Sequence, residues 1–389
     1  MIAFPRRRFV AGAALVAAGP ALAQVAKPKS PLAISIVDVG GALALTQKAF
    51  DAYRRAKPEM VSRMIYTKAP APELPSKLKA QQDAKRVDID MVLTGTDALS
   101  AGIAQGIWTE LFPAHAHALP DLKSILLDPA YQMQRLTKGQ GVVVVYYPSG
   151  PLLEYAPDRV ASPPDSAPAL LEWAKAHPNR FMYARPANSG PGRTFLMGLP
   201  YLLGDSNPKD PEKGWENTWA FLKELDHSIE YYPTGTGATM KELGEGSRDM
   251  IVSTTGWDIN PRVLGIVPKE VKIATLEGFH WVVDAQYMCI PKGVAPERLA
   301  VLLDLMGFML EKPQQATTYD QGYFYPGPAV RDVPLTMAPQ ESQLAIAEFG
   351  RPEYKRLIAD APKEIPLDAE PLVYAFRRWD EQIGSRKTQ

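Results

Sequence analysis

Apolar runs in the first hundred residues alternate with segments whose apolar positions recur at helical spacing. Residues 32–39, LAISIVDV, form a β-rich apolar run that ends at Gly40 and Gly41. In residues 42–58 the apolar positions lie three to four residues apart, which predicts an amphipathic helix. Because a parallel strand pair needs a crossover connection, this alternation predicts an α/β unit with a mostly parallel sheet. The same succession of strand and helix recurs at residues 61–67 and 74–86 and at residues 89–96 and 97–106.

A second alternating unit follows a continuous β-branched run. Residues 142–147, VVVVYY, are apolar or aromatic throughout, which predicts a strand buried on both faces. After a proline-rich stretch the alternation resumes, and the last fifty residues contain helices and loops without a new strand pattern. The predicted strands are residues 180–184, 228–233, 250–255, 271–278 and 279–293. The predicted helices are residues 169–178, 195–205, 215–225, 238–246, 295–311 and 312–322.

The first 23 residues differ from the rest of the chain. Three arginines at residues 6–8 precede an apolar stretch, and the sequence ALA at residues 21–23 follows it. A basic start, a short apolar stretch and an A-x-A site are the three parts of an export signal peptide. The stretch is shorter than the ~20 residues of a membrane-spanning helix. Because x-Phe-Val follows the arginine pair, we predict a twin-arginine signal peptide at residues 1–23 and a periplasmic protein.

Composition limits the class of partner. The 389 residues carry 43 basic and 43 acidic side chains, and 46% of them are hydrophobic. The length suggests about two domains. Loss of the three arginines of the signal peptide leaves a slight acidic excess, which does not favour nucleic acid as a partner. We therefore expect the partner to be a small-molecule solute or another protein. We expect the protein itself to be a monomer.

Residues 288–330 resemble a region of the periplasmic solute-binding proteins of ABC importers. They read MCIPKGVAPERLAVLLDLMGFMLEKPQQATTYDQGYFYPGPAV, with a strand, an Ile-Pro-Lys turn, a long helix, a second helix and an aromatic exit. The sequence is similar in this way to the extracellular solute-binding family 1, which includes polyamine, thiamine and ferric-iron receptors. Together with the signal peptide and the two α/β units, the resemblance covers nearly the whole chain.

The resemblance implies a two-lobe periplasmic-binding-protein fold of type II, in which crossing strands act as the hinge between two α/β lobes. It implies a discontinuous N-lobe, residues 27–142 and 278–389, around a C-lobe of residues 143–277. It also implies that the interlobe cleft holds a solute and that the partners are the permease and ATPase subunits of an ABC importer. It implies no cofactor and no enzymatic activity.

Ligands of open α/β sheets bind beyond the carboxyl ends of the strands, where helix N-termini present free N–H groups and a partial positive charge. Loops after the predicted strands are therefore the candidates for ligand contact. The candidates from the N-lobe are Asp38, Gly40 and Gly41, then Tyr66, Thr67 and Lys68, then Thr94, Gly95, Thr96 and Asp97. The candidates from the C-lobe lie in residues 188–194, 234–237 and 254–258, and they include Ser189, Gly190, Arg193, Thr194, Thr236, Thr254, Trp257 and Asp258.

The segment SGPGRT, residues 189–194, carries the most specific of these expectations. Small residues let the backbone approach a ligand, and a helix N-terminus favours an anionic group. Arg193 would add a planar, bidentate donor. The segment therefore predicts a ligand with an anionic group. The alternative is a helix capped by Ser189 or Thr194, with Arg193 in solvent.

Three aromatic and acidic positions leave alternatives open. Trp257 either stacks on the ligand or packs in the core. Asp284 and Gln286 lie two apart on a strand and so share one face, which looks either into the cleft or into the protein. Asp284 is the acidic candidate on that face. Trp281 points to the other face unless a bulge intervenes, so its role is undecided.

Other ligand classes and activities are less well matched. Polyamine receptors of the family use acids and aromatic walls, whereas this sequence has glycine, proline and arginine in residues 189–194. Tyr231 and Tyr232 resemble the paired tyrosines of ferric-iron receptors, but neighbours in a strand face opposite sides. His115 and His117 have no partner at metal spacing, so no metal site is predicted. Hydrolase, zinc-protease and P-loop motifs are absent from the sequence, which favours a receptor over a periplasmic enzyme on this scaffold.

Overall fold

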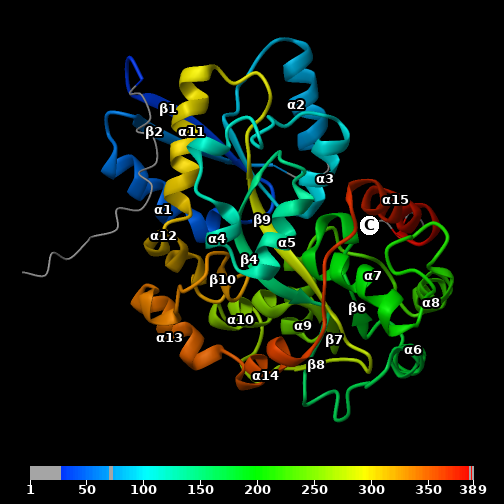
Figure 1. Ribbon diagram of the computed structural model, residues 1–389. Coiled ribbons are helices and arrows are strands. Elements are labelled where there is room, and N and C mark those ends of the chain that lie inside the picture. Colours follow the sequence, from blue (N-terminus) through cyan, green and yellow to red (C-terminus); the bar gives the residue numbers. More distant parts are fainter. Residues whose placement is uncertain (1–27, 70–72, 385–386, 388–389) are drawn as a thin grey trace, which may run out of the picture.

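The computed structural model describes residues 28–69, 73–384 and 387. The predicted signal peptide lies outside the described residues. Two sheets flanked by helices form two lobes (Figure 1), which confirms the predicted two-lobe α/β fold. The strands are β1 Leu32–Asp38, β2 Val61–Lys68, β3 Met91–Thr94, β4 Val142–Gly150, β5 Leu152–Tyr155, β6 Phe181–Met182, β7 Met250–Ser253, β8 Lys272–Ala274, β9 Trp281–Cys289, β10 Gly327–Pro328 and β11 Lys363–Glu364.

The larger sheet defines the N-lobe and the smaller sheet defines the C-lobe. The N-lobe sheet has seven strands in the order β10-β4-β9-β3-β1-β2, with β11 paired to β9. The C-lobe sheet has four strands in the order β6-β7-β5-β8. Among the described residues, no helix combines the length and the apolar character that crossing a membrane requires.

Helices cover both sheets, and those predicted from the spacing of apolar residues begin within two residues of the predicted start, with one exception. The helix expected at residues 195–205 begins earlier, at Gly190. The helices are α1 Leu43–Ala56, α2 Leu74–Asp83, α3 Thr96–Ala104, α4 Leu122–Ile125, α5 Asp128–Leu136, α6 Ala167–Ala176, α7 Gly190–Leu202, α8 Glu216–Asp226, α9 Thr236–Glu245, α10 Thr255–Val263, α11 Pro296–Met309, α12 Lys312–Ala316, α13 Gln340–Phe349, α14 Pro352–Asp360 and α15 Ala369–Gln382. Short 3₁₀ helices are η1 Ala116–Ala118, η2 Pro186–Asn188, η3 Thr317–Tyr319 and η4 Leu335–Met337.

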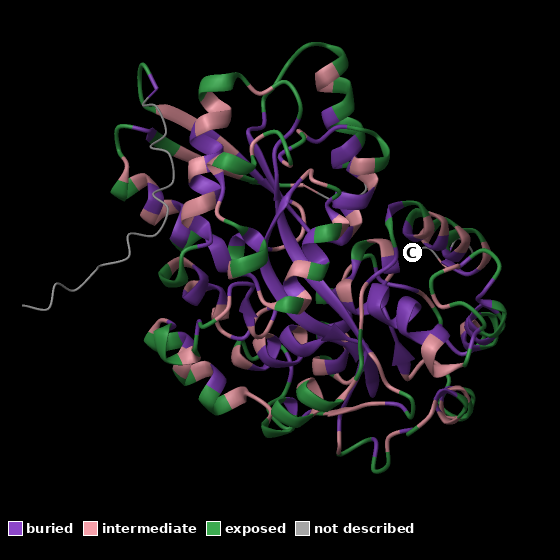
Figure 2. Ribbon diagram, in the orientation of Figure 1, coloured by how far each residue is buried: buried purple, intermediate pink, exposed green. Residues whose placement is uncertain are grey.

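Strand pairing is mixed, whereas the sequence predicts mostly parallel sheets. β1 pairs in parallel with β2 and β3, as the strand–helix alternation requires. β9, however, pairs antiparallel with both β3 and β4. The chain runs out of the N-lobe along β4 and returns along β9, so these two crossing strands have opposite directions (Figure 1). Every residue of β4 is buried, as the apolar run of residues 142–147 predicts, and every residue of β9 is buried as well, including Asp284 and Gln286 (Figure 2).

The boundary between the lobes falls at two points in the chain. Leu152 packs in the N-lobe core and Leu153 in the C-lobe core, so the first crossing lies at residues 150–153 and not at 142–143 as expected. The physical reason is that β4 continues the N-lobe sheet to its end. On the return, Val282 packs in the C-lobe core and Val283 in the N-lobe core.

The end of the chain differs from the expected N-lobe assignment of residues 278–389. Leu372 and Trp379 of α15 pack in the C-lobe core together with Phe195. The indole N–H of Trp379 donates a hydrogen bond of 3.0 Å to the Tyr183 hydroxyl. α15 is thus part of the C-lobe core, because its apolar face finds its partner there.

Two further local predictions are wrong. Residues 228–233 form no strand, because their backbone bonds are scattered over different partners. Ser228 O accepts from Asn179 N, Ile229 O accepts from Lys387 Nζ, and Pro233 O accepts from Arg185 N. Conversely, β11 lies in the region expected to contain no strand, where two residues pair in parallel with the start of β9. Both errors concern short segments in which tertiary contacts decide the backbone conformation.

Candidate functional site

A cavity with a volume of about 190 Å³ lies between the two lobes. It is lined at the N-terminal ends of five helices: α1 and α3 from the N-lobe, and α7, α9 and α10 from the C-lobe. Three of these helices directly follow the carboxyl ends of strands, namely β1, β3 and β7. This is the position at which open α/β sheets bind ligands.

Glycines let the N-lobe loops approach the cavity closely. A Cβ atom at Gly40 would lie 2.1 Å from Gln286 Oε1 and 2.6 Å from Gly95 N. Gly41 has a φ of +85°, which favours glycine. Asp38 stabilises this turn, since its Oδ1 accepts a 2.9 Å hydrogen bond from Gly41 N. Burial raises the pKa of Asp38, and its side chain supports the turn at the start of α1.

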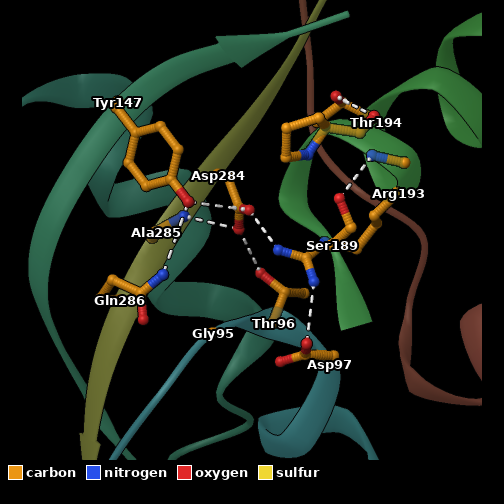
Figure 3. A network of polar contacts seen from close by, with 12 residues as sticks. Gly95, Thr96, Asp97, Tyr147, Ser189, Arg193, Thr194, Asp284, Ala285 and Gln286 are labelled. Atoms are coloured by element: carbon orange, nitrogen blue, oxygen red, sulfur yellow. Dashed lines mark hydrogen bonds and ion pairs between the residues drawn. The ribbon is translucent and has the colours of Figure 1, made fainter. Parts of the chain in front are cut away.

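Arg193 extends from α7 of the C-lobe toward two carboxylates that lie on N-lobe elements (Figure 3). Its Nη1 donates to Asp97 Oδ2 of α3 at 3.0 Å, and its Nη2 donates to Asp284 Oδ2 of β9. The side chain of Arg193 is 4% exposed and that of Asp284 is 1% exposed. Arg193 is therefore not a solvated surface residue: it forms an ionic connection between the lobes.

Asp284 is held by several donors at once. Its Oδ1 accepts from Thr96 Oγ1 and from Ala285 N, each at 2.9 Å, and its Oδ2 accepts from Tyr147 OH at 3.0 Å (Figure 3). Burial, together with Asp284, raises the pKa of Tyr147 well above its ordinary value, so the hydroxyl keeps its proton and donates. The carboxylate of Asp284 is thus fully engaged within the protein.

Burial by itself would lower the pKa of Arg193, but Asp284 and Asp97 outweigh burial and the pKa is raised. The guanidinium therefore stays charged. Asp97 is less enclosed than Asp284, with 15% of its side chain exposed, and it lines the cavity. Asp97 and Arg193 are the charged side chains among the described residues that line the cavity, and each comes from a different lobe.

Three buried polar atoms at the cavity have no hydrogen-bond partner within the described chain: Arg193 Nε, Thr254 Oγ1 and Gln286 Oε1. All three side chains belong to residues at most 3% exposed. Thr254 is the N-cap residue of α10, yet its side chain makes no capping hydrogen bond. An unpaired buried polar group costs about 1–3 kcal/mol, so these three atoms are available to hydrogen-bond a polar molecule in the cavity.

An aromatic wall closes the cavity on another side. Tyr323 stacks on Phe324 with ring centroids 4.2 Å apart, and Phe324 stacks on Tyr147 at 4.7 Å. Trp257 contacts Tyr323 edge to face at 5.4 Å. These four rings line the cavity, so its surface combines an apolar wall with the charged and unpaired groups described above.

The structure brings part of the predicted site residues to the cavity. Gly40, Gly41, Gly190, Arg193, Thr236 and Trp257 line it. Thr96 and Asp284 lie in the hydrogen-bond network beneath it. Ser189 and Thr194 act within the helix start: Ser189 Oγ accepts from Gly192 N at 3.1 Å, and Thr194 Oγ1 donates to Pro191 O at 3.0 Å.

Three predicted residues have other roles. Asp38 supports its turn, as described. Tyr66 lies on the edge strand β2, and its hydroxyl donates to Asp51 Oδ1 at 3.0 Å. Asp258 is fully buried on the opposite side of α10 from Trp257, where it accepts hydrogen bonds from Arg262, Arg351 and Tyr354. Adjacent helix positions point in different directions, so Trp257 and Asp258 cannot both face the cavity.

Tyr147, Tyr323 and Phe324 line the cavity and were not among the candidates. Tyr147 sits inside the long run of β4, where the sequence resembles any buried strand. Tyr323 and Phe324 follow Gly322, whose φ is +78°, and precede the Pro326 turn. An aromatic pair in a glycine- and proline-flanked loop is the one sequence feature that hints at their role.

No metal centre is visible in the described residues, since no group of three or more His, Cys, Asp or Glu side chains is placed to hold an ion. Neither tyrosine of the pair at residues 231–232 lines the cavity. Tyr231 OH donates to Glu242, and Tyr232 OH donates to Asp226 Oδ1 at 2.8 Å.

The fold is similar to those of solved transport proteins. An ABC transporter protein from Clostridium perfringens ATCC 13124 aligns with a TM-score of 0.65 and 13% identity, covering 91% of this chain and 100% of that one. A periplasmic thiamin binding protein aligns at 0.64 and 13%, covering 93% and 99%. A putative spermidine/putrescine ABC transporter protein from Listeria monocytogenes aligns at 0.62 and 13%, covering 90% and 98%. No curated protein matches the chain in sequence.

Residues 48–345 match the family described as bacterial extracellular solute-binding protein. This match spans both lobes and includes most residues of the interlobe cavity. The chain belongs to the bacterial extracellular solute-binding proteins.

Proposed function

We propose that this protein is the substrate-binding component of an ABC importer, and that it captures a small polar solute with an anionic group between its lobes. The observation that carries the proposal is the cavity at five helix N-termini, with unpartnered atoms of Arg193, Thr254 and Gln286 at its surface. Membership of the solute-binding family and the fold shared with ABC transporter proteins support it.

The size of the cavity supports a small solute. Its 190 Å³ lie below the ~300–1,000 Å³ of sites that hold drug-sized ligands. The C-lobe wall supports an anionic group on that solute. α7, α9 and α10 all direct their N-termini to the cavity, and the lining residues of this lobe in the described chain include no acid. Helix N-termini and an arginine donor are the usual partners of a carboxylate or phosphate.

Capture by closure follows from the position of Arg193. A ligand can favour the closed form only through contacts that it makes better in that form. Groups from both lobes line the cavity, so a bound solute gains its full set of contacts when the lobes meet. We infer that the closed, loaded monomer is the form that the permease and ATPase subunits receive, in the periplasm after export.

Other solutes of this fold fit less well. A similar structure is described as iron-bound HitA from Pseudomonas aeruginosa. Here Tyr231 and Tyr232 are engaged with acids away from the cavity. Similar structures are also described as spermidine/putrescine transport proteins. A long polycation would leave the donor groups of the C-lobe wall without acceptors, so we do not favour this class.

The proposal is tested by mass spectrometry of small molecules that co-purify with the mature protein, followed by thermal-shift titration with each of them. Ligand that binds only the folded state raises the melting temperature in a concentration-dependent way. We expect at least one acidic polar solute to do so and to be recovered chemically unchanged after long incubation. Conversion of the solute would indicate an enzyme, and a broad metabolite screen without any shift would contradict a receptor.

A further inference from the structure

We infer that the solute is a small zwitterion of the amino-acid type, with its acidic end on the C-lobe wall and its ammonium group at Asp97. This inference rests on the proposed function and narrows it to one class of ligand. The observation behind the inference is that the two lobes contribute opposite charges to the cavity. Asp97, the acid that lines the cavity, comes from the N-lobe, whereas Arg193 and three helix N-termini come from the C-lobe.

The charges of the site do not suit a simple anion. Arg193 is already paired with the buried Asp284, which accepts hydrogen bonds from three further groups. Together, Arg193, Asp284 and Asp97 therefore carry one negative charge in excess. A monoanion would add a second negative charge in a poorly solvated space, where like charges repel strongly. A zwitterion leaves the net charge of the site unchanged.

The acidic end has defined partners on the C-lobe wall. Arg193 Nε is an N–H donor without an acceptor, and Thr254 Oγ1 is a hydroxyl without a partner at the start of α10. A carboxylate placed between them would accept from both and would lie at helix N-termini, where negative charge is favoured. The hydroxyl of Thr254 has no partner within the described chain, so it is available to a ligand at no cost in internal hydrogen bonds.

The ammonium end has acceptors on the N-lobe side. Asp97 Oδ1 accepts from Ala98 N and Oδ2 from Arg193 Nη1, which leaves further lone pairs on the partly exposed carboxylate. Gln286 Oε1 is a buried acceptor with no donor in the described chain. The aromatic rings of Trp257 and Tyr323 line the same cavity and would attract a cation. A purely anionic solute would leave Gln286 Oε1 without a donor.

The experiment compares matched probes by isothermal titration calorimetry on the mature protein. The probes are the twenty standard amino acids, 3-aminopropanoate and 4-aminobutanoate, each paired with the acid that lacks its amino group and the amine that lacks its carboxylate. We expect at least one zwitterion to bind at least tenfold more tightly than both of its matched partners. No zwitterion binding below 1 mM would overturn the inference.

Two variants assign the ends of the ligand. Asp97→Asn should weaken binding of the preferred zwitterion at least tenfold more than it weakens binding of the matched acid without the amino group. Thr254→Val should weaken the zwitterion and the acid but not the amine. Asp83→Asn, on the exposed face of α2, is the matched control and should leave every affinity unchanged. Equal losses for zwitterion and acid in Asp97→Asn would contradict the ammonium contact.

The outcomes separate this inference from the receptor function. If an acid or a dication binds best, or if co-purification identifies a solute of another class, the zwitterion is excluded while the receptor function stands. If no solute of any class binds or co-purifies, both fail. Since Asp97→Asn keeps a side chain of the same shape, and Thr254→Val removes no internal hydrogen bond, melting temperatures close to that of the parent will show that both variants fold.

Discussion

At the scale of single residues, Arg193 has two roles that the structure separates. Its Nη atoms pair with Asp97 and Asp284 across the lobes, while its Nε has no hydrogen-bond partner within the described chain and is the atom that we propose binds the ligand. Asp284 is buried and engaged by four donors, so its charge depends on Arg193 for compensation. A substitution of Arg193 therefore affects folding as well as binding, and the two effects must be measured apart.

Arg193→Ala should lower the free energy of unfolding by about 3–5 kcal/mol, because it leaves the buried charge of Asp284 unpaired. Urea denaturation measures this loss. Adding Asp284→Asn to Arg193→Ala should recover part of it, since the unpaired charge is then gone. Arg377→Ala on the exposed face of α15 is the control and should change stability by less than ~0.5 kcal/mol. Unchanged stability in Arg193→Ala would mean that Asp284 does not need its partner.

A second residue prediction concerns Glu154 in the centre of β5. Both of its carboxylate oxygens are buried without a hydrogen-bond partner in the described chain. Burial, reinforced by the nearby Asp258, raises its pKa from 4.5 to about 8. The folded protein therefore keeps this proton up to about pH 8, whereas the unfolded chain releases it near pH 4.5. The free energy of unfolding consequently falls as the pH rises from about 4.5 to about 8.

Glu154→Gln should remove that pH dependence, because glutamine stays neutral throughout. Denaturation midpoints measured from pH 5 to pH 9 should fall less steeply in the variant, and the variant should be the more stable protein at pH 9. The control Glu172→Gln changes a side chain that is 73% exposed and should follow the parent curve. Parallel curves for Glu154→Gln and the parent would show that Glu154 is ionised in the folded protein.

At the scale of elements, the start of α7 shows how glycine spacing positions a functional arginine. A Cβ atom at Gly192 would lie 2.1 Å from the backbone oxygen of Ala184, whereas one at Gly190 would meet nothing within 4 Å. Gly192 thus lets the first turn of α7 pack on the preceding loop, and this packing sets where Arg193 leaves the helix. Gly190 instead faces the cavity.

Gly192→Ala should destabilise the protein by about 1–3 kcal/mol through overpacking against backbone that cannot yield. Gly190→Ala should leave the melting temperature unchanged or slightly raised, since alanine favours a helix. The two variants are matched, as they add the same methyl group two residues apart. A similar loss of melting temperature in both would mean that the close contact at Ala184 does not constrain α7.

At the scale of the whole molecule, few ionic contacts bridge the lobes at the cavity. Asp97 on α3 is the acid of the N-lobe wall, and it contacts Arg193 directly. The chain crosses between the lobes along β4, along β9 and in the segment from β11 to α15, the C-terminal helix that packs in the C-lobe core. We expect such an arrangement to let one lobe rotate against the other about the crossings.

Asp97→Ala should therefore shift the ligand-free protein toward an open form. We expect a larger radius of gyration in small-angle X-ray scattering than for the parent, and recovery of the compact value on addition of saturating ligand. Asp83→Ala, on α2 away from the cavity, is the control. An identical radius of gyration for the parent and for Asp97→Ala would show that this ion pair does not hold the lobes together.

Much of the fold is predictable because its information is local in the sequence. The alternation of apolar runs with helical spacing predicts the elements of both lobes, and the apolar run of residues 142–147 and the predicted strand at residues 279–293 indicate the crossing strands. Loops after strands, together with their glycines, place Gly40, Gly41, Gly190 and Arg193 at the cavity. Each of these follows from neighbours within a few residues.

The remaining features depend on contacts between distant segments, which no local pattern encodes. The direction of β9, the packing of α15 in the C-lobe, and the aromatic wall at Tyr323 and Phe324 are of this kind. The sequence by itself determined the two α/β units and an arginine at a helix start. Only the tertiary structure decided that Arg193 meets Asp97 and Asp284, because residues roughly a hundred positions apart become neighbours only when the chain crosses between lobes.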